Sequence, residues 1–157
     1  MLVIILILED QKKGSLTMQI TRQADYAVRA VLYLAQLGSE QRASTSQIAQ
    51  EQQIPPSFLA KIVSQLSVAG LLQTSRGARG GVSLARSPEA ISLLEVVEAI
   101  DGPILLNECV SGNGVCTFGE DCPMRPIWCD AQAELVDRLK QTTFSSFVQP
   151  ANIAVPA

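Results

Sequence analysis

Four cysteines gathered in one short segment are the residues of this chain best suited to chemistry. They are Cys109, Cys116, Cys122 and Cys129, and the 157 residues contain no others. The segment that holds them is rich in Gly, Asn and Asp and contains Pro123, so we expect a loop there. Cysteine thiolates are the usual ligands of iron–sulfur clusters. The sequence therefore predicts a metal or iron–sulfur site.

Zinc binding and thiol oxidation are the alternatives for these cysteines. The pairs of short Cys-x2–4-Cys spacings that are typical of structural zinc sites are missing, which favours iron–sulfur. In a cluster-free protein, Cys129 would resolve an oxidised loop cysteine. In a cluster protein, Cys129 would be either a fourth ligand or a buried free thiol.

The composition excludes several kinds of site. The chain contains no histidine, and no serine or cysteine nucleophile has an evident base beside it, so we expect no enzyme activity. Residues 2–8 are apolar, but they are far shorter than the roughly 20 residues that cross a bilayer, and no basic stretch precedes them. We expect residues 1–17 to be a leader upstream of a true start at Met18, and a short added strand is the alternative. We also expect a cytoplasmic protein with thiols rather than disulfides and no membrane partner.

The charges are divided unevenly along the chain. Residues 18–86 hold seven basic and three acidic residues, a net charge of +4, whereas residues 87–157 hold three basic and ten acidic residues, a net charge of −7. This asymmetry indicates that the first part meets a polyanion and the second does not.

The first part has the pattern of a helix-turn-helix. Apolar residues recur at helical spacing over residues 21–37, which predicts an amphipathic helix that Thr21 can cap. Ser44 and Gln47 have the spacing of a capping box and open a short second helix. A third helix begins near Pro56 and ends near Gly70.

Two short alternating runs then flank Arg76–Gly81, which predicts a β-hairpin with a basic tip. A helix-turn-helix followed by such a hairpin is a winged helix, in which one helix enters the major groove of DNA and the wing contacts the backbone or minor groove. The residues predicted to contact DNA are Ser57, Phe58, Lys61, Arg76 and Arg79.

The second part is expected to be helical around the cysteine loop. Ser92 and Glu95 form a capping box for a helix that ends near Asp101. After Pro126 a long helix carries an apolar stripe, which suits either dimerisation or packing on its own domain. The expected fold is therefore mainly α, with a winged helix-turn-helix over residues 18–86, a cluster loop and dimerisation helices over residues 87–148, and a tail over residues 149–157.

Several segments together resemble the IscR/NsrR/RirA family of bacterial winged-helix transcription regulators. They are MQITRQADYAVRAVLYLA, SQIAQEQQIPPSFLAKIVSQLSVAGLLQTSRGARGGVSLAR, ISLLEVVEAIDG, the three-cysteine loop and CPMRPIW. The resemblance covers Met18 to about Val148. It implies a homodimer that reads a nearly palindromic operator in double-stranded DNA. It also implies a two-iron or four-iron cluster held by Cys109, Cys116 and Cys122.

The fourth cluster ligand is where this chain departs from some family members. Regulators that resemble IscR use a histidine three residues after the third cysteine, but Arg125 stands there, and a guanidinium has no free lone pair. Members that resemble NsrR take an aspartate from the first helix of the partner subunit, and Asp25 occupies the matching place. Asp25 and Cys129 are therefore the two candidates. The alternative for Asp25 is that of an acidic residue favoured in the first helical turn by the helix dipole. Ala60 replaces an acidic residue that discriminates between operators in some relatives.

The sequence thus predicts a transcription regulator, with repression in the cluster-bound state, that senses cluster status, nitric oxide or redox stress. The alternatives are a cluster-free thiol-redox regulator and a cysteine-based electron-transfer protein in which the helices are only a scaffold.

Overall fold

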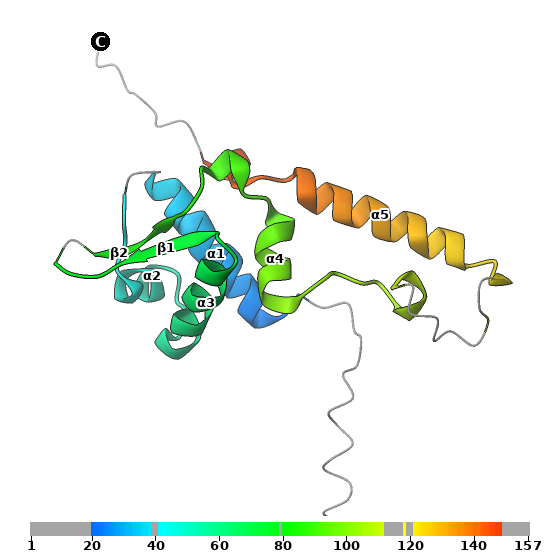
Figure 1. Ribbon diagram of the computed structural model, residues 1–157, viewed down its shortest axis with the longest axis horizontal. Helices are drawn as coiled ribbons and strands as arrows, with labels where there is room; N and C mark the ends of the chain where they lie inside the picture. Colours follow the sequence, from blue (N-terminus) through cyan, green and yellow to red (C-terminus); the bar gives the residue numbers. More distant parts are fainter. Residues whose placement is uncertain (1–19, 39–40, 79, 112–117, 119–120, 149–157) are drawn as a thin grey trace, which may run out of the picture. The chain divides into compact units, whose positions relative to one another are not determined.

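The computed structural model describes residues 20–38, 41–78, 80–111, 118 and 121–148. Figure 1 follows the chain through two compact units. The larger unit runs from Ile20 to Ile104 and takes in the described residues from Ala133 on, and the smaller unit is Leu105–Gln132. The expected leader and the expected tail lie outside the described residues.

Three helices build the core of the larger unit. They are α1 (Arg22–Leu37), α2 (Thr45–Glu51) and α3 (Pro56–Val68). The buried side chains of α1 recur at helical spacing and are Ala24, Ala27, Ala30, Val31, Leu34 and Ala35. Those of α3 are Leu59, Ile62, Val63 and Leu66. Apart from Ala24, these side chains belong to one continuous hydrophobic cluster. Removal of their apolar area from water is the main force that holds the two helices together.

The helix starts follow the capping chemistry that the sequence predicts. Thr21 caps α1, and its hydroxyl accepts a hydrogen bond from the backbone N–H of Ala24 at 3.2 Å. Ser44 caps α2 in the same way by accepting from the N–H of Gln47 at 3.1 Å. The Gln47 amide, however, donates to the Tyr33 hydroxyl at 3.0 Å. The predicted capping box of α2 is therefore half formed.

A tight turn joins α2 to α3. Gln53 adopts a φ of 52°, in the left-handed region, and thereby reverses the chain. The next residue, Ile54, is buried and donates its N–H to the Ala49 carbonyl oxygen at 2.9 Å. Pro56 begins α3, where its missing N–H leaves no hydrogen bond unmade. The two helices and their turn form the predicted helix-turn-helix.

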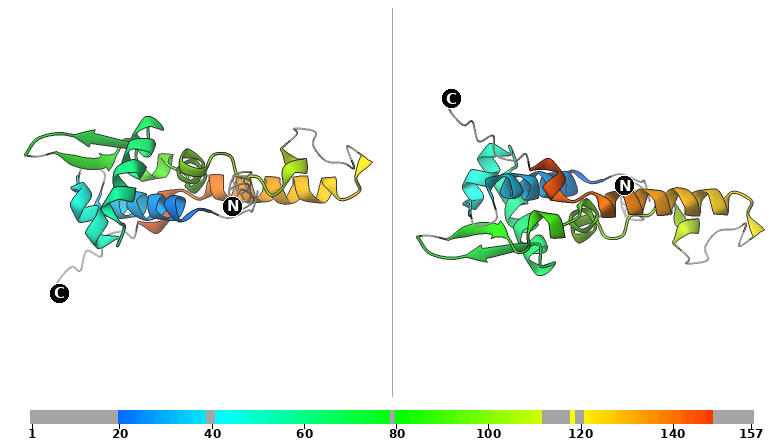
Figure 2. Two further views of the ribbon diagram at one scale, coloured as in Figure 1. Left: turned by 90° about the horizontal axis from the view of Figure 1, so that it is seen from below. Right: turned by 90° about the horizontal axis from the view of Figure 1, so that it is seen from above.

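A two-stranded antiparallel hairpin follows. Its strands are β1 (Leu72–Ser75) and β2 (Gly81–Leu84), in a register that places Ser75 opposite Gly81. Figure 2 shows this hairpin projecting from the three helices. The hairpin is the predicted wing.

The wing also makes an isolated β-bridge that the sequence pattern does not predict. Ala43 and Val82 form a bridge and exchange both backbone hydrogen bonds, at 3.0 and 2.8 Å. Gly81 permits this approach. Its φ is +147°, and a Cβ built there would lie 2.9 Å from the Ala43 carbonyl oxygen. A residue with a side chain would therefore be strained and would also collide with the backbone.

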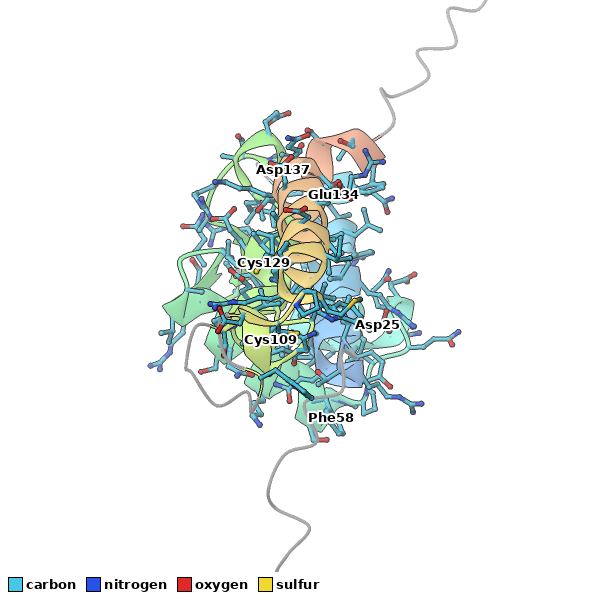
Figure 3. The ribbon with its side chains drawn as sticks, turned by 90° about the vertical axis from the view of Figure 1, so that its right-hand side faces the viewer. Asp25, Phe58, Cys109, Cys129, Glu134 and Asp137 are labelled. Carbon is cyan, nitrogen blue, oxygen red and sulfur yellow. The ribbon has the colours of Figure 1, made fainter. Side chains whose placement is uncertain are left out.

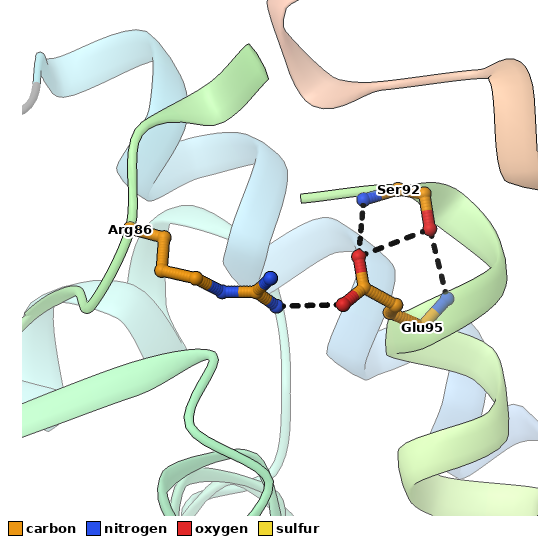
Figure 4. A network of polar contacts seen from close by, with 3 residues as sticks. All are labelled: Arg86, Ser92 and Glu95. Carbon is orange, nitrogen blue, oxygen red and sulfur yellow. Dashed lines mark hydrogen bonds and ion pairs between the residues drawn. The ribbon is translucent and has the colours of Figure 1, made fainter. Parts of the chain in front are cut away.

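The chain then enters α4 (Leu93–Asp101) through a polar network (Figure 4). The Ser92 hydroxyl accepts from the Glu95 N–H at 3.3 Å, and the Glu95 carboxylate accepts from the Ser92 N–H at 3.0 Å, which completes the predicted capping box. Arg86 donates to the same carboxylate at 2.8 Å. Burial alone would raise the pKa of Glu95, but the hydrogen bonds from Ser92 and Arg86 outweigh it and hold that pKa below its ordinary value.

Long-range contacts tie both ends of α4 into the larger unit. At its C-terminal end, Asp101 accepts hydrogen bonds from the backbone N–H and the hydroxyl of Thr21, at 2.9 and 2.6 Å. At its N-terminal end, Ser92 forms a bridge with Thr143. Phe144, at the start of η5 (Phe144–Phe147), is 1% exposed and belongs to the core.

The smaller unit contains the start of the cysteine segment and the first half of the last helix. Cys109 lies in η3 (Glu108–Val110), a single 3-10 turn, where the sequence predicts only loop. The last helix is α5 (Arg125–Gln141), which begins before Pro126 rather than after it. A proline in the first helical turn costs no hydrogen bond, so the helix includes it.

No helix within the described ranges combines the length and the apolar character that are needed to span a membrane.

Candidate DNA-binding surface and cysteine centre

The predicted recognition residues lie on the exposed side of α3. Ser57, Phe58 and Lys61 are all exposed, and they occupy the first two turns of the helix. Ser57 and Lys61 are four residues apart and so share a face. This end of α3 therefore presents two polar side chains and one aromatic ring to solvent.

Phe58 is exposed but also packs against α1. Its ring packs edge-on against the ring of Tyr26 on α1, with centroids 6.1 Å apart and planes at 76°. Phe58 nevertheless stays 46% exposed (Figure 3). Its ring thus positions α3 against α1 and still has an open face.

The wing carries Arg76 at its tip, exposed and next to β1. Arg79, the second predicted wing arginine, lies outside the described residues. A further arginine, Arg42, precedes the Ala43 bridge, and its guanidinium donates a hydrogen bond to the Ser75 hydroxyl. The sequence does not single out Arg42, because no local pattern reveals a hydrogen bond between residues so far apart along the chain.

Three cations of this surface have no carboxylate partner among the residues that the structure describes. Among the described residues of the larger unit, Arg29 pairs with Asp25 and Arg86 pairs with Glu95. Arg42, Lys61 and Arg76 have no carboxylate partner in that part of the structure. Their charges are therefore available to an external anion.

Three of the four cysteines fall in the described part of the smaller unit. Cys109, Cys122 and Cys129 are free thiols, and the first two are half-buried whereas Cys129 is exposed. Figure 3 labels Cys109 on η3 and Cys129 on α5. Cys116 lies outside the described residues. Cys129 is exposed in the single chain, so the alternative in which it is a buried small hydrophobe would need a second copy of the chain to cover it.

Side-chain hydrogen bonds hold the start of the cysteine segment. The Cys109 thiol donates to the Asn107 side-chain oxygen at 2.9 Å. The backbone N–H of Leu106 donates to the side-chain oxygen of Gln132 on α5, also at 2.9 Å. Cys109 is therefore anchored to the same helix that carries Cys129, within one compact unit.

Asp25, the other candidate for the fourth ligand, lies in the first turn of α1. Its carboxylate accepts from the Arg29 guanidinium at 2.7 Å, and both side chains are about half exposed, at 49% and 48%. The Arg29 guanidinium also lies 5.7 Å from the centroid of the Tyr26 ring. Asp25 thus has a cation as its partner through one carboxylate oxygen, and its other oxygen could serve as a ligand.

The donor set suits a soft, thiolate-bound group. Cys109 and Cys122 are free, partly accessible thiols, and the chain has no histidine that would favour zinc or a haem. No group of three or more His, Cys, Asp or Glu side chains converges within the described ranges, which leave out Cys116. The chemistry of the thiols fits an iron–sulfur cluster.

Comparisons with known proteins agree with this fold. The model of the Rrf2 family, described as an iron-dependent transcriptional regulator, matches residues 20–150. The HTH-type transcriptional regulator NsrR of Shouchella clausii is 32% identical over 132 residues, which are 83% of this chain and 89% of that protein. The HTH-type transcriptional regulator IscR of Erwinia tasmaniensis is 31% identical over 140 residues, 89% of this chain and 84% of that protein.

A comparison with a solved structure also agrees with this fold. CymR, described as the global cysteine regulator of B. subtilis, superposes with a TM-score of 0.70 at 26% identity and covers 85% of this chain and 100% of that chain. The predicted winged-helix fold and the resemblance given above are thereby confirmed. The chain belongs to the Rrf2 family of transcriptional regulators.

Proposed function

We propose that this regulator is a cytoplasmic, homodimeric DNA-binding repressor whose operator affinity depends on an iron–sulfur cluster. Cys109, Cys116 and Cys122 would hold the cluster, and Asp25 of the partner subunit or Cys129 would complete it. The observation that carries the proposal is the pair of free, half-buried thiols of Cys109 and Cys122 in one compact unit of a winged-helix regulator. The relatives named NsrR and IscR lend support, and the description of the family as iron-dependent favours a metal-containing sensor over an electron-transfer protein.

The DNA-binding half of the proposal rests on exposure and charge. Ser57 and Lys61 on α3 can reach base edges or phosphates, and Arg76 in the wing can reach the backbone, since all three are exposed. Lys61 and Arg76 have no carboxylate partner among the described residues. An arrangement of this kind suits a recognition helix in the major groove with a wing beside it.

The dimer is supported by the last helix. None of the 17 residues of α5 is buried within the chain, although the helix carries Ile127 at 59% exposure and Trp128 at 41%. Large apolar side chains left in water on one helix are typical of a surface that pairs with another molecule. We propose that a second copy of α5 covers them, which gives two recognition helices for a two-fold operator.

The signal would act through the residues around Asp25. A bound cluster supplies iron–thiolate bonds that oxidants, nitric oxide or iron loss can break. One Asp25 carboxylate oxygen pairs with the Arg29 guanidinium, and ligation would add a bond at the same carboxylate. Arg29 and Tyr26 are in contact, and Tyr26 packs on Phe58 of the recognition helix. The proposal requires that the two states of Asp25 favour different positions of α3.

Cys116→Ala tests the cluster assignment. Anaerobically purified wild-type protein should absorb in the visible range, and its native mass spectrum should give a dimer that carries iron and inorganic sulfide. The variant should lose both signals while keeping its helical circular dichroism. A variant that retains a full cluster, or a wild-type dimer that carries zinc, contradicts the assignment.

A cluster-free thiol regulator is the second candidate, and the exposure of Cys129 favours it. The structurally similar protein CymR is described as a cysteine regulator, and this description also fits a thiol regulator. Oxidation would then join Cys129 to a loop cysteine, with two electrons and two protons passing to a peroxide. Peptide mapping after peroxide treatment distinguishes the two, because only the thiol regulator yields a disulfide that controls DNA binding and disappears in Cys129→Ser.

A further inference from the structure

Arg42 lies outside the helix-turn-helix and outside the hairpin, yet the structure attaches it to the wing. The backbone bridge between Ala43 and Val82 adds this segment to the edge of β2. The Arg42 guanidinium then donates a hydrogen bond to the hydroxyl of Ser75, the last residue of β1. Arg42 is therefore held by two separate interactions, the backbone bridge of its neighbour Ala43 and the hydrogen bond of its own side chain.

The side chain reaches Ser75 by crossing Gly81. Ser75 and Gly81 are opposite one another in the hairpin, and the Cβ of Arg42 lies 3.4 Å from the position that a Cβ of Gly81 would occupy. Because Gly81 has no side chain, the arginine can pass over β2 to β1. The guanidinium is thus placed at the end of β1, and Arg76 follows Ser75 directly in the chain.

The Arg42 guanidinium has more N–H donors than its hydrogen bond to Ser75 uses. A guanidinium has five N–H donors, and within the described residues the Ser75 hydroxyl is the acceptor that Arg42 meets. Arg42 is exposed and has no carboxylate partner among those residues. A pre-positioned arginine with free donors is suited to the oxygens of a phosphate, which it can bind with two parallel hydrogen bonds.

We propose that Arg42 is a third arginine of the wing and contacts the phosphate backbone of DNA, with Ser75 as its positioning residue. The inference rests on the proposed DNA-binding function and extends it to a residue outside the helix-turn-helix. DNA is the occupant that fits, since Arg42, Arg76 and the recognition helix α3 belong to one compact unit whose first part carries a net charge of +4 over residues 18–86. Phosphate contacts fix the register of a protein on DNA without reading its sequence.

The test begins with duplexes that the wild-type dimer enriches from a random library. Fluorescence anisotropy then gives the affinity for such a duplex over a range of salt, from about 50 to about 200 mM. Each phosphate that a basic side chain neutralises contributes about 0.9 to the slope of log K against log[salt]. Arg42→Gln should make the slope shallower by about 0.9 for each phosphate that Arg42 neutralises, and it should weaken binding by on the order of tenfold at the lower salt.

Two further variants separate a phosphate contact from a structural role. Ser75→Ala removes the same hydrogen bond but keeps the charge, so it should weaken binding by less than Arg42→Gln and leave the slope nearly unchanged. Lys140→Gln removes one exposed positive charge near the end of α5 and should leave both affinity and slope unchanged. Thermal unfolding of each variant verifies that it is folded.

Three outcomes overturn the inference. The first is a folded Arg42→Gln with a wild-type slope, and the second is equal loss of affinity in Arg42→Gln and Ser75→Ala without any change of slope. The third is an equal change of slope in Lys140→Gln, which would reflect net charge alone. Failure of the wild-type dimer to enrich any duplex would instead contradict the proposed function, so the two failures are distinguishable.

Discussion

The ring of Tyr26 meets the ring of Phe58 edge-on, at a centroid distance of 6.1 Å. Tyr26 directly follows Asp25 on α1, and Phe58 directly follows Ser57 on the recognition helix. A candidate ligand and a candidate DNA contact are therefore joined by one aromatic pair. This contact gives the helix-turn-helix a physical link to the proposed sensor.

We predict that this aromatic pair is coupled energetically. Edge-to-face pairs contribute about 0.5–1.5 kcal/mol beyond the area they bury. Urea unfolding of Tyr26→Leu, Phe58→Leu and the double variant should give a coupling free energy in the lower half of that range, because Phe58 is 46% exposed. If the two single effects simply add, the rings are neighbours without a specific interaction.

The fourth ligand can be assigned by comparing Asp25→Ala with Cys129→Ala. If Asp25 of the partner subunit completes the cluster, Asp25→Ala should change the visible spectrum and speed cluster loss in air, whereas Cys129→Ala should do neither. Arg29→Gln should then also speed cluster loss, since the Arg29 guanidinium, 2.7 Å from one carboxylate oxygen, orients the carboxylate.

The opposite pattern would assign Cys129 instead. Cys129→Ala would then alter the spectrum, and Asp25→Ala and Arg29→Gln would leave it unchanged. Equal cluster stability in all three variants contradicts both assignments and leaves a ligand from outside the chain.

Local patterns predict the helices and the wing well. Thr21 and Ser92 cap the helices that the sequence assigns to them, and Pro56 opens α3 as expected. The hairpin lies on the two alternating runs that flank Arg76–Gly81. Capping, helical periodicity and strand alternation depend on residues close together in the chain, so a single sequence carries them.

Contacts between distant segments could not be predicted in this way. The Ala43–Val82 bridge and the Arg42–Ser75 hydrogen bond join residues that only the folded backbone brings together. The sequence pattern assigns no helix or strand to Phe144, but the residue is 1% exposed and follows Thr143, which bridges to Ser92. Periodicity cannot reveal a single core residue that lies outside a regular element.

Glu95 should make the stability of the larger unit pH-dependent. Its pKa is lowered in the folded protein, so its contribution is present above the ordinary glutamate pKa of about 4.3 and is lost as the pH falls through the lower folded-state pKa. Glu95→Gln should therefore reduce the free energy of unfolding at about pH 7 but make little difference at about pH 3.

The size of this effect should be modest, at most about 1 kcal/mol, because the Arg86–Glu95 pair is exposed to solvent. Urea unfolding at the two pH values measures this effect. In an Arg86→Gln background, the costs of Glu95→Gln at the two pH values should differ by less. A penalty for Glu95→Gln that is the same at both pH values would contradict the account.

Gly81→Ala should reduce the stability of the protein by straining the wing. The φ of +147° strains any side chain, at roughly 1–3 kcal/mol, and the added Cβ would lie 2.9 Å from the Ala43 carbonyl oxygen. Gly70→Ala is the matched control, because Gly70 also has a positive φ, +72°, but nothing lies within 4 Å of an added Cβ. Urea unfolding should therefore give a larger loss of stability for Gly81→Ala, by about 1 kcal/mol or more. Equal losses would mean that the close approach to Ala43 has no energetic consequence.

The central claim is that the cysteine centre controls binding to DNA. The most direct test measures the affinity of one anaerobic preparation for an enriched duplex, before and after its cluster is removed by a chelator and an oxidant. A final measurement after reduction with dithiothreitol excludes an effect of disulfides. We predict that loss of visible absorbance is accompanied by at least about a tenfold loss of affinity, a change of about 1.4 kcal/mol. An affinity that stays the same while the absorbance disappears would contradict the account.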